Sequence, residues 1–101
     1  MTAASVVARL EQTCEACPEQ YEGWTAGGSA VYIRYRHGRL SFGLGFTLTE
    51  AVRASVKVYE GPDEYYGYEW IRAKLAPFLV LPQVFTASPL EDRAPDWSQS
   101  P

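Results

Sequence analysis

The stretch Ala30 to Phe46, AVYIRYRHGRLSFGLGF, decides the fold, because two runs of alternating side chains flank a His-Gly turn. Successive residues of a β-strand point to opposite faces of the sheet. One face of this hairpin is therefore apolar, and it consists of Val31, Ile33, Tyr35, Leu40, Phe42, Leu44 and Phe46. The stretch predicts the central β-hairpin of a small antiparallel sheet, with the rest of the chain packed on one side of it.

The other face of the hairpin is polar and sets aromatic and cationic side chains beside a track of small residues. It carries Tyr32, Arg34 and Arg36 on the first strand, and Ser41, Gly43 and Gly45 on the second. Glycines that alternate within a strand indicate that another backbone or side chain approaches closely. In the turn His37-Gly38, the glycine supplies the positive φ that a two-residue hairpin requires.

Length and composition predict one small domain outside the membrane. The 101 residues are 47% hydrophobic, which suits a single compact core. Nine Lys and Arg against twelve Asp and Glu give a net charge of −3, which argues against a strongly basic nucleic-acid-binding protein. No apolar run approaches the roughly 18 residues of a membrane span, so we expect a cytoplasmic protein.

The segment before the hairpin has helical spacing. Apolar residues recur three and four positions apart at Val6, Leu10, Cys14 and Cys17, which predicts an amphipathic helix from Thr2 to Cys17. The two cysteines would close this helix at the end where its dipole disfavours a thiolate, and the chain has a single His to complete a zinc site. We interpret both cysteines as buried, reduced and structural, and we expect no metal or other cofactor.

Tyr21 to Thr25 has the composition of a first strand, which would join the hairpin through Ala26 to Ser29 in a three-stranded antiparallel β-meander. One large aromatic residue of this strand must face the core. We favour Trp24 as that inward-facing residue.

After Phe46 the hydrophobic period changes from two to 3.6. Thr47 to Glu50 has the spacing of a capping box, which predicts a helix that continues to Tyr59 and ends at Gly61-Pro62. The alternative is a short helix followed by a strand from Ser55 to Glu60, because Val56, Val58 and Tyr59 favour strands.

Glu69 to Leu75 predicts a second, short helix, and the apolar run Phe78 to Leu81 is expected to fold back on the core. The predicted fold class is therefore α+β, with an N-terminal helix, a three-stranded antiparallel β-meander and one or two C-terminal helices packed on one sheet face. Residues 1–81 would form a single compact domain, and residues 82–101 a mobile tail rich in Pro, Ser and Asp.

Catalysis has little support in the sequence. The lone His37 lies in a tight turn between Arg36 and Arg39, with no nucleophile placed beside it, and no glycine-rich loop opens a helix as phosphate binding requires. Asp63 and Glu64 are too few for a metal site. We expect that the protein is not an enzyme.

The polar face of the hairpin is the predicted partner-binding surface, together with an acidic and aromatic segment that follows the helix. Its candidate residues are Tyr32, Arg34, Arg36, Arg39, Tyr65 and Tyr66. Tyr and Arg supply the contact area and directional donors that are enriched at binding hot spots. The competing interpretation is that Arg34 and Arg36 pair with surface carboxylates such as Glu22 across the strands.

Two short motifs resemble nucleic-acid-related families. Gly43-Leu44-Gly45-Phe46-Thr47 leading into Ala51 resembles the approach to the second helix in double-stranded-RNA-binding domains, although Leu48 and Thr49 stand where that family carries its phosphate-binding lysines. Thr47 to Val52, TLTEAV, is similar to the start of a helix in HicB-like antitoxins. These similarities imply the alternative function, a nucleic-acid-binding or antitoxin-like regulatory protein that uses the Tyr and Arg face.

The wider run from Tyr21 to Val52, with YEGW, YIRYRHGRLSFGLG and TLTEAV, resembles small uncharacterised proteins of actinobacteria and their phages. The resemblance implies an accessory protein of a phage or mobile element. We therefore expect a non-enzymatic protein-interaction module that binds and inhibits a host or defence protein, as a monomer or a homodimer.

Overall fold

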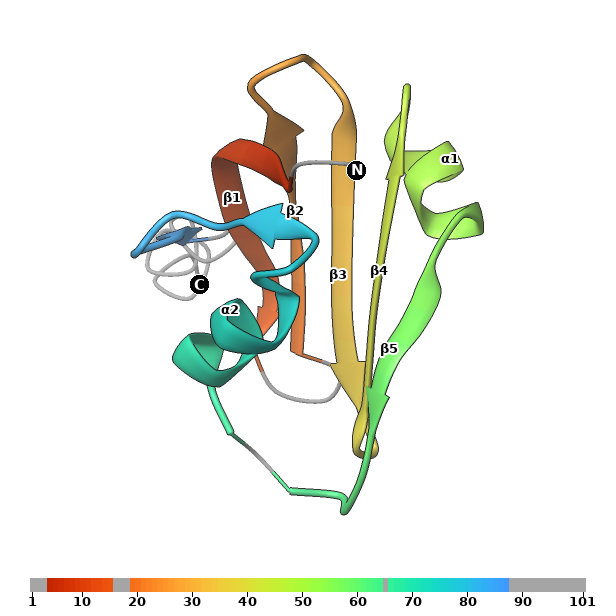
Figure 1. Cartoon of the computed structure of the whole chain (residues 1–101), viewed down its shortest axis with the longest axis vertical. Coiled ribbons are helices and arrows are strands. Elements are labelled where there is room, and N and C mark those ends of the chain that lie inside the picture. Colours follow the sequence, from red (N-terminus) through yellow and green to blue (C-terminus); the bar gives the residue numbers. More distant parts are fainter. Residues whose placement is uncertain (1–3, 16–18, 65, 88–101) are drawn as a thin grey trace, which may run out of the picture.

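A computed structural model describes residues 4–15, 19–64 and 66–87. These residues form a strongly curled, mixed β-sheet with two short helices (Figure 1). The elements are β1 (Ser5–Glu15), β2 (Glu19–Thr25), β3 (Ala30–Arg36), β4 (Arg39–Gly45), α1 (Leu48–Arg53), β5 (Val56–Glu60), α2 (Tyr68–Leu75), β6 (Leu79–Val80) and β7 (Thr86–Ala87). The predicted α+β class with an N-terminal helix and a three-stranded meander is wrong, because the described residues are mostly β.

The sheet is built outward from the central hairpin. Its strands follow the order β5-β4-β3-β2-β1-β6, and β7 pairs with β1 outside this path. Strands β1 to β5 pair antiparallel with their neighbours, whereas β6 and β7 both run parallel to β1. The long first strand is thus hydrogen-bonded along both of its edges, to β2 on one side and to the late strands on the other.

The central hairpin is confirmed. Strands β3 and β4 pair without a register shift from Ala30 opposite Gly45 to Arg36 opposite Arg39. The turn residues His37 and Gly38 both have positive φ, 52° and 77°, as a two-residue turn between twisted strands requires. The apolar face lies in the core as predicted, except for Phe46, which follows the end of β4 and is 86% exposed.

The first strand explains why helical spacing was a misleading signal. The predicted helix from Thr2 to Cys17 is wrong, because the described part of this segment forms β1. A register shift between Val7 and Arg9 inserts an extra residue, so the buried Val7 and Leu10 stand three positions apart on one face of a strand. Cys14 is a half-buried free thiol in this strand, and Cys17 lies outside the described residues.

In β2 the predicted orientation of Trp24 is also wrong. Tyr21 is fully buried and faces the core, whereas Trp24 points to the other face and is 48% exposed. The register with β3 sets this orientation, because Tyr21 lies opposite the buried Ile33. A strand can turn only one set of alternating residues inward, and here that set contains the tyrosine.

The segment after the hairpin follows the alternative that the sequence left open. A helix that continues to Tyr59 is wrong, because α1 ends at Arg53 and β5 then adds to the edge of β4. The predicted capping is present: Thr47 Oγ1 accepts from Glu50 N at 3.2 Å, and the Glu50 carboxylate accepts from Phe46 N at 2.9 Å. The cap starts a helix, but it does not determine how far the helix extends.

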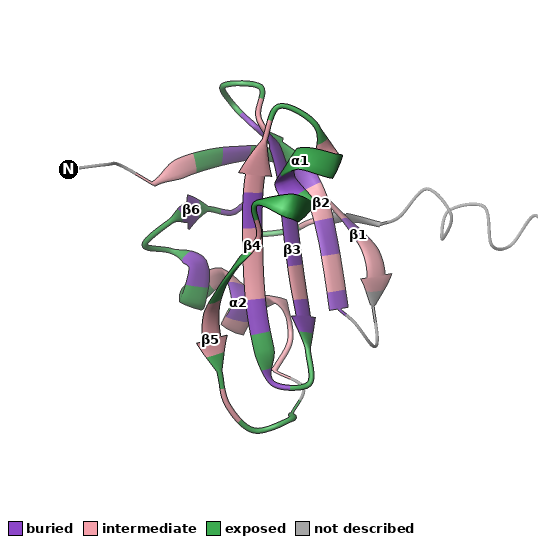
Figure 2. Cartoon of the chain, turned by 90° about the vertical axis from the view of Figure 1, so that its right-hand side faces the viewer, coloured by how far each residue is buried: buried purple, intermediate pink, exposed green. Residues whose placement is uncertain are grey.

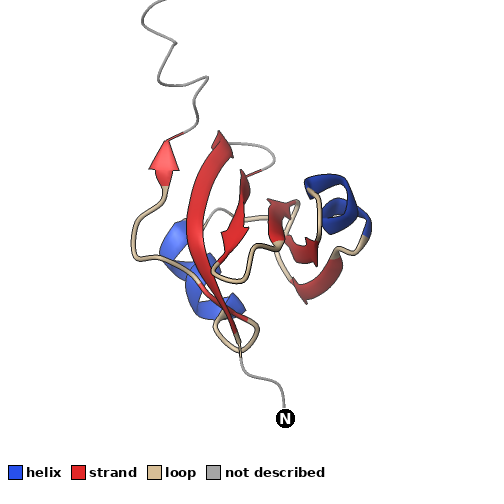
Figure 3. Cartoon of the chain, turned by 90° about the horizontal axis from the view of Figure 1, so that it is seen from above, coloured by secondary structure: helices blue, strands red, loops and turns tan. Residues whose placement is uncertain are grey.

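The two helices lie on opposite faces of the sheet, which Figures 2 and 3 show from two further sides. Helix α2 buries Ile71 and Leu75 in the larger of two buried clusters, which we call the main core. The other members of the main core come from strands β1 to β4 and β6, together with Leu81. Helix α1 packs on the other face, where Ala51 forms a small cluster with Ala30 and Tyr32. The prediction that the helices share one face is therefore wrong.

Helix α1 packs directly on the glycine track of β4, which consists of Gly43 and Gly45. A Cβ atom on Gly43 would overlap the carbonyl oxygen of Ala51, and one on Gly45 would lie 2.8 Å from Ala51 N. The close approach expected from these alternating glycines is thus made by the chain's own helix. Helix α1 therefore covers this part of the polar face.

Residues 82–87, part of the predicted mobile tail, return to the sheet. Phe85 packs edge-on against the rings of Tyr21 and Tyr68, with centroid distances of 5.2 and 5.0 Å. The Tyr68 hydroxyl donates to the Pro82 carbonyl at 2.5 Å, and β7 then pairs with β1. The remainder of the proposed tail, residues 88–101, lies outside the described residues.

A carboxylate is enclosed at the start of β2. Glu19 is 1% exposed, and its Oε2 accepts a hydrogen bond from the Tyr21 hydroxyl, which also accepts from Gln12 Nε2 at 3.2 Å. Its Oε1 is buried without a hydrogen-bond partner. Burial raises the pKa of Glu19 above its ordinary value of 4.5, and the hydrogen bond from Tyr21 offsets only part of this rise.

We expect the variant Glu19→Gln to be more stable than the native protein at pH 7, by about 1 kcal/mol. Because the pKa of Glu19 is raised in the folded state, its contribution favours folding below pH 4.5 and is lost as the pH rises through the raised pKa. The neutral amide avoids that loss, so the two proteins should have the same free energy of unfolding near pH 4. Urea unfolding from pH 4 to 8 measures it, with Glu69→Gln on the exposed side of α2 as the control. A difference independent of pH would contradict the assignment.

Candidate functional site

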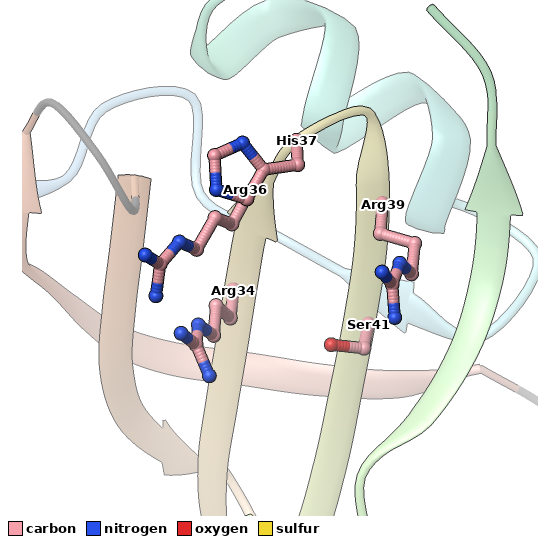
Figure 4. Close-up of a pocket in the computed structure, with 5 residues that line it drawn as sticks. All are labelled: Arg34, Arg36, His37, Arg39 and Ser41. Atoms are coloured by element: carbon pink, nitrogen blue, oxygen red, sulfur yellow. The ribbon is translucent and has the colours of Figure 1, made fainter. Parts of the chain in front are cut away.

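Four side chains of the central hairpin form a rectangle on the face opposite the main core. Arg34 lies directly across from Ser41, and Arg36 directly across from Arg39. Residues two apart on a strand share a face, and cross-strand neighbours have Cβ atoms about 5 Å apart. Figure 4 shows Arg34 and Arg36 extending from β3 on the side away from β4, while Arg39 and Ser41 project from β4.

These residues line a pocket of about 290 Å³ at the turn end of the hairpin, to which His37 also contributes. We call Arg34, Arg36, His37, Arg39 and Ser41 the arginine site. The turn beside it is fixed by the segment after β5, because Gly61 N donates to the Gly38 carbonyl at 2.9 Å. A Cβ atom on Gly38 would overlap the Gly61 carbonyl oxygen, so the two backbones are in direct contact. The turn that carries the arginine site is therefore held in place by backbone contact with the segment after β5.

The acidic side chains near the arginine site lie at its rim. Arg39 Nε lies 3.8 Å from Glu60 Oε2, and His37 Nδ1 lies 3.4 Å from Asp63 Oδ2. All four of these side chains are more than half exposed, so solvent weakens both contacts. Glu60 is closer to Lys57, at 2.5 Å, and the pKa of Glu60 is lowered chiefly by its hydrogen bond with Lys57.

The two arginines of β3 have no ion-pair partner in the part of the chain that the structure describes. The expected alternative, in which Arg34 or Arg36 pairs with Glu22, is absent from the described contacts, where Glu22 accepts instead from Gln20 Nε2 at 3.3 Å. Arg34 Nε is enclosed by protein atoms and has no acceptor. A buried donor without a partner typically costs about 1–3 kcal/mol of stability.

The pairing of Arg36 with Arg39 adds a second unfavourable feature. Like charges directly opposite each other on neighbouring strands destabilise a sheet. An anion bound beside these two side chains would offset this repulsion. The arrangement is therefore better suited to holding an anion than to stabilising the hairpin alone.

Tyr32, which was predicted to bind a partner, does not lie on the exposed surface of the arginine site. It is 8% exposed, it packs against Ala30 and Ala51, and its hydroxyl donates to Gln20 Oε1 at 3.2 Å. Tyr32 does lie on the same face of β3 as Arg34, as strand alternation predicts, but α1 covers this face at the end where Tyr32 lies.

The acidic and aromatic segment lies apart from the arginine site. Tyr65 is outside the described residues. Tyr66 packs against the main core, where its ring stacks on Trp70 at a centroid distance of 4.4 Å. Its hydroxyl donates to Glu64 Oε1 at 2.9 Å, and this hydrogen bond is the main cause that raises the pKa of Tyr66 to about 12. The structure thus brings Arg34, Arg36 and Arg39 together but places Tyr66 on the other face of the sheet.

Ser41 and His37 line the site but were not among the predicted binding residues. The sequence contained a signal for both. Once the two-residue turn is fixed at His37-Gly38, the antiparallel register places Ser41 opposite Arg34 and leaves His37 beside the Arg36–Arg39 pair.

The side chains of the arginine site are suited to an anionic ligand. Its side chains offer guanidinium, imidazole and hydroxyl donors but no carboxylate. Among the described residues, no group of three or more His, Cys, Asp and Glu side chains could hold a metal ion, and no helix has the length and apolar character to span a membrane. No family model, curated protein or solved structure matches this chain.

Proposed function

We propose that this protein is a non-enzymatic protein-interaction module that binds an acidic segment of its partner through the arginine site. The observation that carries the proposal is the group of three arginines in one pocket, with Arg36 facing Arg39 and Arg34 Nε without an acceptor. Arg is enriched at binding hot spots because its planar guanidinium makes two parallel hydrogen bonds to a carboxylate.

The charge of the whole chain supports a specific contact over a general attraction to anions. The net charge is −3, so the chain as a whole does not attract anions. A partner must present its acidic group to the turn end of the hairpin to gain from it. Such local complementarity fixes the register of a complex and speeds encounter.

The partner that we propose is a host or defence protein, which binding would inhibit. This part of the proposal follows from the resemblance of residues 21–52 to small proteins of actinobacteria and their phages. The proposed mechanism is occupation of an acidic surface of that partner, which requires no catalytic group in this chain.

We expect Arg36→Glu to reduce binding of a fluorescent glutamate-rich decapeptide at least tenfold, because the reversed charge repels the ligand from the centre of the site. Arg36 is exposed and has no ion-pair partner among the described residues, so the melting temperature should not fall. Fluorescence anisotropy at two salt concentrations measures the affinity.

The matched control is Arg53→Glu, which makes the same charge change on α1, away from the arginine site. Equal losses in the two variants would show a general charge effect and would contradict the proposal. An RNA or DNA oligonucleotide in place of the peptide tests the nucleic-acid alternative, for which the affinity should fall linearly with salt on logarithmic axes.

A further inference from the structure

We infer that the anion that fits the arginine site is a phosphate monoester, carried on a phosphorylated side chain of the partner. This inference rests on the proposed function and narrows the acidic segment to one chemical group. The three features that select the group are the number of donors, their arrangement and the charge that they leave unbalanced.

The donors come from both strands of the hairpin. Arg34 and Ser41 form one cross-strand pair, and Arg36 and Arg39 form the next pair towards the turn. Neighbouring pairs on one face are about 7 Å apart along the strands, and the two members of a pair about 5 Å apart. These spacings are those of the Cβ atoms, from which the long arginine side chains extend to line the pocket. A tetrahedral group can accept hydrogen bonds from several directions at once, whereas a planar carboxylate directs its two oxygens to one side.

The unbalanced charge matches a dianion. Of the three guanidinium groups, only Arg39 has a carboxylate neighbour among the described residues, and that contact, to Glu60, is 3.8 Å long and exposed. Arg34 and Arg36 are left without a compensating charge. A phosphate monoester carries a charge of about −1.5 to −2 at pH 7, whereas a carboxylate or a phosphodiester carries one negative charge.

Arg34 adds a guanidinium group that has no acceptor among the described residues. Arg34 Nε is buried and has no partner, although the Arg34 side chain lines the pocket. An ionised acceptor makes hydrogen bonds about twice as strong as a neutral acceptor does. The enclosed Nε cannot reach a ligand, so a phosphate oxygen would bind the other guanidinium nitrogens of Arg34, which are not enclosed.

Three small ligands separate these contributions: phenyl phosphate, phthalate and benzoate. Phthalate has the charge of the phosphate without its tetrahedral shape, and benzoate has neither. We expect phenyl phosphate to bind at least tenfold more tightly than both, measured by amide chemical shifts of the full chain at constant ionic strength. The largest shifts are expected in β3, in β4 and at the turn.

Two variants test whether the binding belongs to this site. Arg36→Gln should weaken phenyl phosphate binding at least tenfold, and Arg53→Gln should leave it unchanged. In a buffer without phosphate, Arg36→Gln should also melt at the same or a higher temperature than the native chain, because it removes the repulsion with Arg39. Retained binding in Arg36→Gln would overturn the inference.

The other outcomes distinguish this inference from the proposed function. If phthalate or benzoate binds as tightly as phenyl phosphate, the phosphate assignment is overturned, while the binding of acidic segments stands. If a phosphodiester dinucleotide binds more tightly than phenyl phosphate, the site serves nucleic acid, and the monoester is rejected. If neither phenyl phosphate nor the glutamate-rich decapeptide binds, both the inference and the proposed function fail.

Discussion

Gly43→Ala is expected to lower the free energy of unfolding by about 3 kcal/mol, at the upper end of the range for overpacking a closed site. The new Cβ atom would overlap the carbonyl oxygen of Ala51 and lie 2.9 Å from the backbone nitrogen of Ser55. Both obstacles are backbone atoms, so no side-chain rotation can make room. The helix α1 must move away from β4, and this exposes Ala51, which is fully buried in the native chain.

Denaturant unfolding followed by circular dichroism measures this loss. The matched control is Gly27→Ala in the loop between β2 and β3, where the nearest atom to a new Cβ is Thr25 Oγ1 at 3.9 Å. This substitution should change the stability by less than about 0.5 kcal/mol. Equal stability of the two variants would show that α1 does not rest on the glycine track.

Leu10→Ala is the second substitution with a large expected effect, a loss of about 2–5 kcal/mol. Leu10 is 1% exposed and packs in the main core, where truncation leaves a cavity between the sheet and α2. The same measurement on Val6→Ala should give a loss below about 1 kcal/mol, because Val6 is 53% exposed.

This pair of variants also tests the secondary structure of the first segment. In an amphipathic helix Val6 and Leu10 would share one buried stripe, and both substitutions would be costly. In β1 the register shift after Val7 turns Leu10 inward while Val6 stays at the surface. Comparable losses from both variants would favour the helix and contradict the strand.

The hairpin could be predicted from the sequence because its alternation runs without interruption through both strands. The turn at His37-Gly38 fixed the register, and the register placed Arg34, Arg36 and Arg39 together. These three candidate residues followed from strand periodicity alone. The same register also places Ser41 opposite Arg34 and His37 next to Arg36, so both residues could be predicted from the sequence.

The first strand could not be predicted in this way, because its pattern is not periodic. Register shifts after Val7 and after Gln12 break the alternation, and its outer edge is paired by segments more than sixty residues away in the sequence. Periodicity reports local structure, whereas bulges and long-range pairing arise from the assembled sheet.

The burial of Tyr32 was missed for a related reason. Alternation placed it correctly on the face opposite the core, but that face is covered at one end by α1. Gly43 and Gly45 indicated that something approaches closely, without indicating that it is the next helix of the same chain. Whether a sheet face is open depends on what packs against it, which alternation does not report.

The pairing of β1 with β6 and β7 has a consequence for the order of folding during synthesis. The strand that leaves the ribosome early acquires its second set of neighbours only when residues 79–87 have emerged. Contacts between such distant segments slow folding, because a long loop must close before they form. We expect the nascent chain to hold a formed hairpin and an unpaired edge of β1 until residues 79–87 have emerged.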